Sequence, residues 1–431
     1  MSTALAILGG KPIRNTPYPE YSTIGEQERK GVQEVMDSGV LSGFVARGND
    51  LFYGGAKVLK LEEHFKERFG SRYAVSFNSG TSALHGALIA AGVGPGDEVI
   101  VPPYSMSATA SAVLMCKAVP VFVDVEADMF CIDPKKIEEV ISDRTRAIIT
   151  VNLWGQVSDL GTIAAIAAKY NLVFIEDNAQ GAGAFYHGRS SGTIGDMAMF
   201  SLNRHKSIQC GEGGMVLTDD EELARRLQLS RNHGEVVMDD WGVEEPADLV
   251  GYNYRLSELN AAVAIPQLSR LDEFNALRSE RAETLTRLLE PFDFIAPPAV
   301  REGCTHVWYL YGMLYNENIL NLSRDVFLKA LAAEGVHAAA YEKPIYMLPI
   351  FLKHTEPGTS GFNRVFPSYD KPLPYAEGLC PVVEHVQAKQ IILTNIIRQT
   401  HPVSDIEEFV SALGKVAENA AALRNKFGEV R

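Results

Sequence analysis

The turn formed by Asn78, Ser79, Gly80 and Thr81 could bind a phosphate group. It lies between a short apolar run and an Ala- and Leu-rich stretch that is typical of a helix. Gly80 lets backbone N–H groups approach an anion closely, and the start of a helix adds partial positive charge. The hydroxyl of Thr81 can donate a further hydrogen bond. A plain helix cap is the alternative, because Ser and Thr are common at N-caps.

A second motif, residues 175–180 (IEDNAQ), places a carboxylate at the end of a buried apolar run. If that run is a parallel strand, Asp177 lies at its carboxyl end, where α/β sheets bind their ligands. There Asp177 could bind a metal ion, act as a base or pair with a protonated ring nitrogen. The motif alone does not decide among these roles.

A third motif, residues 200–206 (FSLNRHK), places Lys206 five residues after Ser201, and the glycine-rich residues 211–214 (GEGG) follow. A lysine amine forms Schiff bases with aldehydes, and desolvation or neighbouring cations lower its pKa in favour of that reaction. Arg204 and His205 could supply the positive charge. The alternative is a solvated surface lysine.

The elements that must position these residues lie mainly between residues 70 and 220. Short β-branched runs alternate there with amphipathic segments, which is typical of strands buried on both faces between helices. The sequence therefore predicts an α/β domain with a mainly parallel sheet. The predicted strands are residues 73–77, 98–101, 119–123, 147–151, 172–175, 197–201 and 215–218, and helices are predicted at 82–91, 134–141 and 160–170.

A smaller α+β domain is predicted after a helical region over residues 257–289 and the pair Pro297-Pro298. Its predicted strands are residues 306–315 and 336–341, with a helix over 324–334, a loop over 348–374 and a last helix over 405–427. We expect the N-terminal segment and the large cofactor-binding domain to occupy residues 1–290, and the small C-terminal α+β domain to occupy 291–431.

Taken together and in this order, the three motifs closely resemble those of the DegT/DnrJ/EryC1/StrS family of sugar aminotransferases. The likeness runs from about Gly9 to Ala421 and includes residues 231–234 (RNHG) and 251–255 (GYNYR). The resemblance implies the aspartate-aminotransferase (type I) fold, in which a large, mainly parallel seven-stranded sheet domain flanked by helices precedes a smaller C-terminal α+β domain. It also implies pyridoxal 5′-phosphate (PLP) as the cofactor, and no metal.

The resemblance assigns a role to each candidate site residue. Lys206 would hold the cofactor as a Schiff base and later move the proton, and Asp177 would keep the ring nitrogen protonated so that the ring withdraws electrons. Gln180 would bond near the 3-hydroxyl of the ring, while Gly80, Thr81 and Ser201 would hold the phosphate. Asn253 would reach the cofactor phosphate of a neighbouring subunit, which implies a homodimer with shared active sites.

One position departs from the family pattern. An aromatic residue usually stacks on the cofactor ring from the segment that here comprises residues 104–109 (YSMSAT). Alignment places Met106 there, and a thioether can pack on a π face, though less rigidly than a ring. The alternative is that Tyr104 takes this place by a shift.

The implied reaction moves an amino group from L-glutamate or L-glutamine to a keto sugar, often nucleotide-linked, or to a keto cyclitol, through a pyridoxamine phosphate intermediate. Residues 8–14 and 380–382 are similar to the branch with scyllo-inosose aminotransferases and aminohydroxybenzoate synthases. His306, Trp308, Tyr341 and Lys343 lie in stretches that could face the substrate. The alternatives are a PLP-dependent sugar dehydratase, whose relatives carry His in place of Lys206, and a PLP-binding regulatory protein.

The composition and the sequence pattern limit the expected binding partners and cellular location of the protein. The 431 residues carry 40 basic and 54 acidic side chains, a net charge of −14, and no basic run longer than a pair, so we expect no nucleic-acid partner. The N-terminus lacks a signal-peptide pattern, and no window approaches 18 apolar residues. The five cysteines form no CxxC motif. We therefore expect a cytoplasmic protein with reduced thiols and no membrane span.

Overall fold

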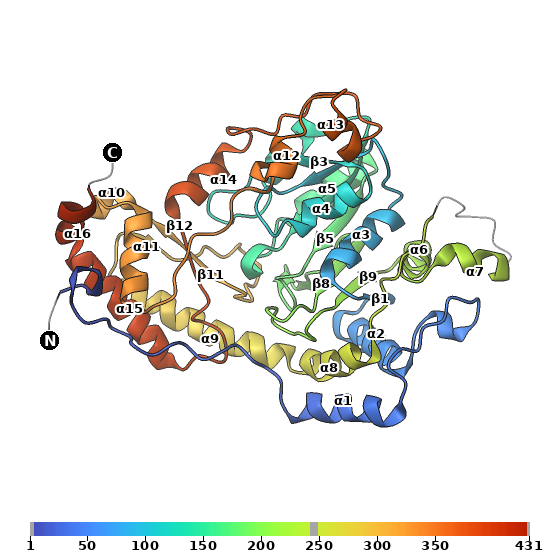
Figure 1. The fold of residues 1–431 in the computed structure, drawn as a ribbon, viewed down its shortest axis with the longest axis horizontal. Coiled ribbons are helices and arrows are strands. Elements are labelled where there is room, and N and C mark those ends of the chain that lie inside the picture. The colour runs from blue at the N-terminus through green and yellow to red at the C-terminus, as the bar shows by residue number, and fades with distance from the viewer. Residues whose placement is uncertain (1–3, 242–248, 429–431) are drawn as a thin grey trace.

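The computed structural model describes residues 4–241 and 249–428, and a seven-stranded sheet lies at its centre (Figure 1). In sheet order the strands are β1 (Tyr73–Phe77), β9 (Gly214–Thr218), β8 (Met197–Ser201), β5 (Val173–Asp177), β4 (Thr145–Val151), β2 (Glu98–Val101) and β3 (Val119–Phe122). Only β9 runs antiparallel to its neighbours in this sheet. The prediction of a mainly parallel seven-stranded sheet is confirmed.

Helices cover both faces of this sheet, as expected for strands that are apolar on both sides. One face packs against α3 (Gly80–Ala90), α4 (Ala108–Met115) and α6 (Glu221–Arg231). The other face packs against α2 (Ala56–Phe69), α5 (Leu160–Tyr170) and α8 (Glu258–Ser269). Outside these layers lie α1 (Glu26–Ser38), which packs on α8, and α7 (Gly234–Trp241), which contacts α6. A separate two-stranded hairpin is formed by β6 (Phe185–Tyr186) and β7 (Arg189–Ser190).

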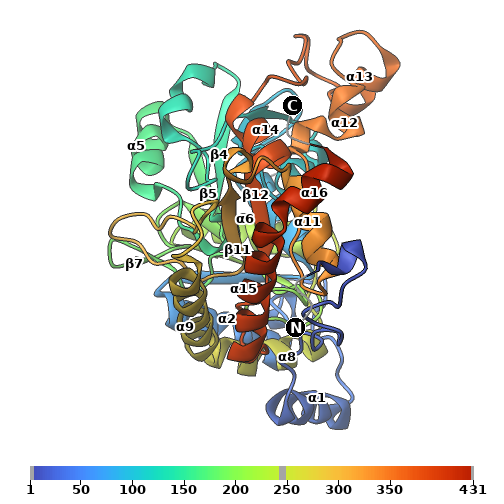
Figure 2. The ribbon, with the colours of Figure 1, turned by 90° about the vertical axis from the view of Figure 1, so that its left-hand side faces the viewer.

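The long helix α9 (Leu271–Leu289) leads out of the sheet region toward the C-terminal part of the chain. That part contains a three-stranded antiparallel sheet, β10 (Ile295–Ala296), β11 (Tyr311–Tyr315) and β12 (Ile391–Thr394). The helix α15 (Val403–Glu418) packs against α9, and Figure 2 shows it as the long helix of this side. The remaining helices here are α10 (Glu317–Leu320), α11 (Arg324–Ala333), α12 (Pro349–Leu352), α13 (Ser360–Val365), α14 (Pro381–His385) and α16 (Ala420–Phe427).

Several elements predicted for the C-terminal part are wrong in detail. The strand predicted over residues 306–315 begins only at Tyr311, because Trp308 has a left-handed backbone (φ 52°) that ends β pairing. The strand predicted over residues 336–341 forms a single bridge, between Ala339 and Leu393. The predicted loop 348–374 contains α12 and α13, and the predicted last helix is broken at Asn419 into α15 and α16. In the region of the central sheet one prediction is also wrong, because the helix predicted over 134–141 is two short 3₁₀ turns.

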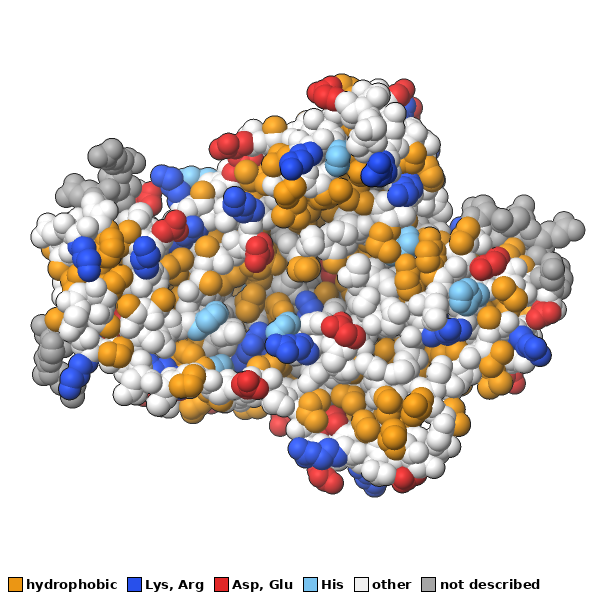
Figure 3. All heavy atoms as spheres, in the orientation of Figure 1, with side chains coloured by type: hydrophobic (Ala, Val, Ile, Leu, Met, Phe, Trp, Pro, Cys, Tyr) orange, Lys and Arg blue, Asp and Glu red, His pale blue; other side chains and the backbone are white. Residues whose placement is uncertain are grey.

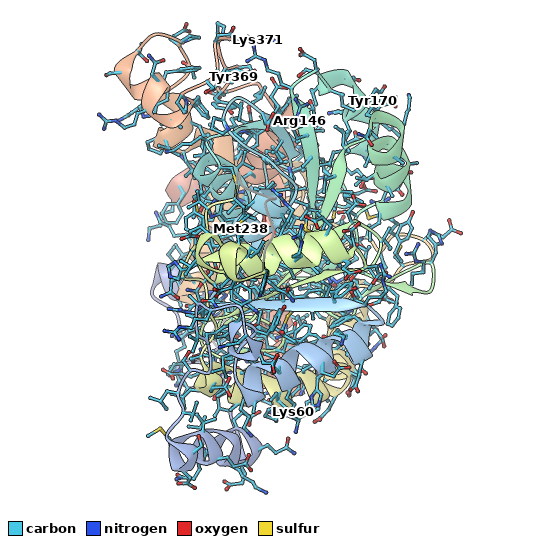
Figure 4. The ribbon with its side chains drawn as sticks, turned by 90° about the vertical axis from the view of Figure 1, so that its right-hand side faces the viewer. Lys60, Arg146, Tyr170, Met238, Tyr369 and Lys371 are labelled. Atoms are coloured by element: carbon cyan, nitrogen blue, oxygen red, sulfur yellow. The ribbon has the colours of Figure 1, made fainter. Side chains whose placement is uncertain are left out.

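Two segments of the chain pack against a part of the fold that is far from them in sequence. Leu5 is buried in the C-terminal core, and Glu334 accepts hydrogen bonds from the backbone N–H groups of Ala6 and Ile13. Residues 345–386 instead contribute to the core under α3 and α4. Tyr369 of that segment donates to Glu98 at the start of β2 and lies at the same end of the molecule as Arg146 of β4 (Figure 4). The domain division at residue 290 stays a prediction.

None of the helices in residues 4–241 and 249–428 is both long enough and apolar enough to cross a membrane.

Candidate active site

A cavity of about 400 Å³ opens at the carboxyl ends of β5 and β8, beside the N-terminus of α3. It is the hollow near the middle of the face in Figure 3, with Lys, Arg and His side chains near its rim. Seven of the eight residues predicted for the site line it. They are Gly80, Thr81, Met106, Asp177, Gln180, Ser201 and Lys206.

One end of the cavity is built from the first turn of α3. Ser79 is the N-cap, and its hydroxyl accepts a hydrogen bond from the backbone N–H of Ser82 (3.0 Å). The N–H groups of Gly80 and Thr81 precede the first bond within the helix, so they remain to bind an anion. A Cβ atom at Gly80 would lie 3.0 Å from the Ser201 Cβ and 3.1 Å from its Oγ. Glycine therefore lets the Ser201 hydroxyl approach the helix end.

The glycine-rich residues 211–214 bring β9 against this turn. Gly211 has φ +84°, a left-handed conformation that favours glycine where the chain reverses between β8 and β9. A Cβ atom at Gly214 would lie only 2.4 Å from the backbone oxygen of Ser79. The motif that follows Lys206 in the sequence thus shapes the β1–α3 turn through close backbone packing.

Asp177 is almost completely buried at the end of β5, with 4% of its surface exposed. One carboxylate oxygen accepts from the hydroxyl of Thr109 (3.0 Å) and the other from the backbone N–H of Ala179 (3.2 Å). Burial raises the pKa of Asp177, while the nearby charge of Lys206 and these hydrogen bonds lower it. A cation placed in the cavity would favour the ionised form.

Lys206 reaches the cavity from the irregular segment between β8 and β9. Its ammonium Nζ lies 4.8 Å from the ring centroid of Tyr309. Its backbone is held from both sides, because its N–H donates to the carbonyl of Asn203 (2.9 Å) and its carbonyl accepts from the hydroxyl of Tyr21 (3.2 Å). The alternative of a freely solvated surface lysine does not fit this half-buried position.

Gln180 is fixed by the neighbouring loop. Its side-chain oxygen accepts from the backbone N–H of Trp154 (2.9 Å), and Trp154 has a left-handed backbone (φ 55°). The hydroxyl of Tyr341 also interacts with Gln180, and burial raises the pKa of that hydroxyl well above its usual value. Both side chains line the cavity.

Met106, rather than Tyr104, lines the cavity. The Met106 side chain is 63% exposed at the rim. Tyr104 is only 1% exposed and packs edge-to-face against Trp154 and Tyr341. If a side chain of residues 104–109 covers a bound ring, this geometry favours the thioether.

Other candidate residues lie elsewhere in the structure. Asn253 is exposed, its side chain accepts from Arg255 (2.9 Å), and it does not line the cavity of its own chain. His306 is buried and stacks on Trp308, and burial lowers its pKa to about 3. Of the candidates for substrate contact, only Tyr341 lines the cavity; the others, His306, Trp308 and Lys343, do not.

Sequence reasoning missed several residues that the fold brings to the site. Tyr309 lines the cavity from the C-terminal part of the chain, and Tyr21 contacts Lys206 from the N-terminal segment. His205 and Glu212 also line it, and both lie within the motif that identified Lys206. Cys210 of the same stretch is buried, which raises the pKa of its thiol to about 12, so it stays protonated.

The donor set fits PLP. An anion cradle lies at the start of α3, a buried carboxylate with a raised pKa at Asp177, and an amine at Lys206, all in one cavity. These suit, respectively, the phosphate, the ring nitrogen and the aldehyde of that cofactor. Within the described residues, no group of three His, Cys, Asp or Glu side chains is arranged to hold a metal ion.

Comparisons with known proteins agree with this geometry. The sequence profile of the DegT/DnrJ/EryC1/StrS aminotransferase family matches residues 23–363. GDP-perosamine synthase of Caulobacter vibrioides is 37% identical over 75% of this chain and 83% of its own length. A Streptoalloteichus tenebrarius protein, provisionally named an L-glutamine:3-amino-2,3-dideoxy-scyllo-inosose aminotransferase, is 32% identical over 98% of this chain and all of its own. An aminotransferase structure from Psychrobacter cryohalolentis superposes with a TM-score of 0.79, at 28% identity over 94% of this chain and 99% of that one.

Proposed function

The chain belongs to the DegT/DnrJ/EryC1/StrS aminotransferase family, whose members depend on PLP, and we propose that it transfers an amino group from L-glutamate or L-glutamine to a keto sugar or keto cyclitol. The observation that carries this proposal is the convergence of Lys206, Asp177 and the start of α3 on one cavity. When bound there, PLP supplies an electron-withdrawing ring that makes the α-proton of an amino acid acidic.

The residues of the chain divide the remaining work. Gly80, Thr81 and Ser201 hold the phosphate, and Asp177 keeps the ring nitrogen protonated. Lys206 holds the cofactor and afterwards acts as the base that removes and returns the α-proton, a task for which its held backbone positions it. Gln180, fixed by Trp154, orients the ring oxygen, and Met106 covers the ring.

The names of two relatives support the proposed class of amino-group acceptor. One relative is named for a GDP-linked amino sugar and another for an aminated inosose, so a keto sugar and a keto cyclitol remain the two candidate classes. Lys206 argues against the dehydratase alternative, because that reaction is expected of relatives with His at its position. His205, although it lines the cavity, is additional to Lys206 and does not replace it.

The active unit is a cytoplasmic homodimer in this proposal. Asn253 is exposed and lies outside the cavity of its own chain, as expected if it contacts the cofactor bound by a neighbouring subunit. Exposed apolar side chains occur in the last turn of α1 and in the segment after it, where Met36, Val40, Leu41 and Leu51 are each about half exposed. Figure 3 shows hydrophobic side chains on the lower bulge that α1 forms. Such a patch is typical of an interface.

Absorption spectroscopy of the purified holoprotein tests the proposal. We expect a yellow protein whose visible band bleaches when excess L-glutamate or L-glutamine is added. Lys206→Ala should abolish turnover, because proton transfer by a positioned base contributes about 10²–10⁴-fold in rate. Lys169→Ala, which replaces an exposed lysine that pairs with Glu138 and does not line the cavity, is the control. A colourless protein that takes up no PLP, or normal turnover by Lys206→Ala, would refute the scheme. Formation of a deoxysugar instead of an amine would favour the dehydratase.

A further inference from the structure

Two arginines lie beside the cavity without a carboxylate partner among the described residues. Arg278 of α9 is completely buried and donates to the carbonyls of Trp308 (3.1 Å) and Tyr309 (3.2 Å) and to the hydroxyl of Tyr21 (3.1 Å). Arg398, which follows β12, places its guanidinium 4.6 Å from the ring centroid of Tyr21. Within the described part of the chain Arg398 makes no side-chain hydrogen bond or ion pair, and the Nε atoms of both arginines are buried without an acceptor.

The surroundings of Arg398 leave its charge uncompensated. Burial lowers the pKa of Arg398, and the neighbouring charge of Arg278 lowers it further. Two more buried polar atoms next to it in the chain, Oε1 of Gln399 and Oγ1 of Thr400, also lack partners. A desolvated cation beside a like charge is unfavourable unless an anion joins it. The cluster therefore has the composition of an anion site that the protein alone does not fill.

Neither arginine lines the cavity itself, but the cluster adjoins its Lys206 end through Tyr21 and Tyr309. The hydroxyl of Tyr21, which accepts from Arg278, donates to the backbone carbonyl of Lys206. Tyr309 lies against the Lys206 ammonium on the cavity side and is an electrostatic neighbour of Arg398. His205, which precedes Lys206 and lines the cavity, has its pKa lowered by burial and further by the charges of Arg204 and Arg398. The anion cradle at Gly80 and Ser201 is a separate feature, built from α3 and β8.

The position relative to Lys206 identifies the anion. In an α-amino acid the carboxylate is attached to the carbon that bears the reacting amine, so it must lie close to Lys206. In a keto sugar linked to a nucleotide, the phosphates are separated from the carbonyl by the sugar ring. A planar guanidinium also matches a carboxylate with two parallel hydrogen bonds.

We propose that Arg398 binds the α-carboxylate of the amino donor, with Arg278 and Tyr21 as positioning residues. This inference rests on the proposed function. It predicts that the donor half-reaction depends on Arg398, whereas cofactor binding does not. Among the described residues the Arg398 side chain has no hydrogen-bond or ion-pair partner to lose, and its replacement removes only the contact with the Tyr21 ring, so the fold should stay intact.

The test compares the holoprotein with Arg398→Gln, Arg398→Lys and a charge-removing control, Arg287→Gln. Arg287 is exposed on α9, the helix that carries Arg278, and it does not line the cavity. The concentration of L-glutamate or L-glutamine that half-bleaches the cofactor band should rise on the order of 10–100-fold in Arg398→Gln, as expected for losing hydrogen bonds to a charged group. Arg398→Lys keeps the charge but not the planar fork, so a smaller rise is expected.

A second readout does not require turnover. Calorimetric binding of 2-methyl-L-glutamate, which has no α-proton to transfer, should weaken by a similar factor in Arg398→Gln, while the cofactor band and the melting temperature stay unchanged. The losses for L-glutamate and L-glutamine should be equal, because both donors carry the α-carboxylate. A loss confined to L-glutamate would overturn the assignment to the α-carboxylate.

The remaining outcomes separate the two proposals. If the native protein bleaches with either donor and Arg398→Gln responds within two-fold of it, the role of Arg398 is wrong and the proposed function stands. An equal loss in Arg287→Gln would also overturn it, because a general positive potential would then explain the binding. If the native protein ignores both donors and does not bind 2-methyl-L-glutamate, the proposed function fails, and the role of Arg398 fails with it.

Discussion

Replacing Gly80 by Ala should weaken PLP binding without unfolding the protein. The added methyl group would lie 3.0 Å from the Cβ and 3.1 Å from the Oγ of Ser201, and 3.3 Å from the sulfur of Met199. Ser201 belongs to the central strand β8, so its Cβ cannot move away freely and its hydroxyl must turn instead. Losing one hydrogen bond to a charged phosphate costs about 1.5–3 kcal/mol. The dissociation constant of PLP should therefore rise on the order of 10–150-fold.

The assay is a titration of the cofactor-free protein with PLP, followed by the absorption of the bound cofactor. Gly94→Ala is the matched control, since a Cβ atom there meets nothing within 4 Å. Ser201→Ala should weaken binding by a similar factor, and the double variant should lose less than the sum because both changes remove the same hydrogen bond. Binding by Gly80→Ala within two-fold of the native protein would refute the close approach of Ser201 to α3 as the basis of the phosphate site.

Two further predictions concern stability. Glu334 is completely buried, accepts from the backbone N–H groups of Ala6 and Ile13 and pairs with Lys415 (2.8 Å), so Glu334→Gln should lower the free energy of unfolding by about 3 kcal/mol. Urea denaturation checks this, with the exposed pair variant Glu63→Gln as a control that should change it by less than about 1 kcal/mol; an equal effect of both would contradict it. Burial lowers the pKa of His85 to about 4 in the folded protein, so the unfolded chain binds the proton more tightly. Stability should then fall by about 3 kcal/mol as the pH drops from about 6.5 to about 4, and His85→Gln should remove this part of the acid sensitivity; an unchanged pH profile would contradict it.

The central sheet could be predicted from the sequence because each of its strands is a local pattern. Residues 147–151 are apolar at four of five positions and all five are buried, as expected for a strand covered on both faces. The C-terminal part could not be predicted as well, because its backbone is decided by distant contacts. Trp308 adopts a left-handed conformation while its carbonyl accepts from Arg278, thirty residues earlier, and no local pattern indicates that contact.

That Gly80, Asp177 and Lys206 line one cavity was also predictable, for the same reason. Gly80, Asp177 and Lys206 each follow a predicted strand, and parallel strands bring their carboxyl ends to one edge. Sequence reasoning left Met106 and Tyr104 open, because a shift of two residues decides which one turns outward. Packing decides it in the structure, where Tyr104 fits between Trp154 and Tyr341.

The residues around Lys206 that we expect to contact the substrates have no comparable signal in the sequence. This difference from the β-strand motifs indicates where variants with altered acceptor preference should be sought. Tyr21, Arg278, Tyr309, Tyr341 and Arg398 come from the N-terminal segment, the connecting helix and the C-terminal part. They come together only when the N-terminal segment, α9 and the C-terminal part pack beside the central sheet. The residues that we propose to hold the cofactor must match a single molecule, whereas this second group must match the amino donor and the acceptor. Variants that change donor or acceptor preference should therefore map to this second group, while variants of the first should change cofactor affinity for every substrate alike.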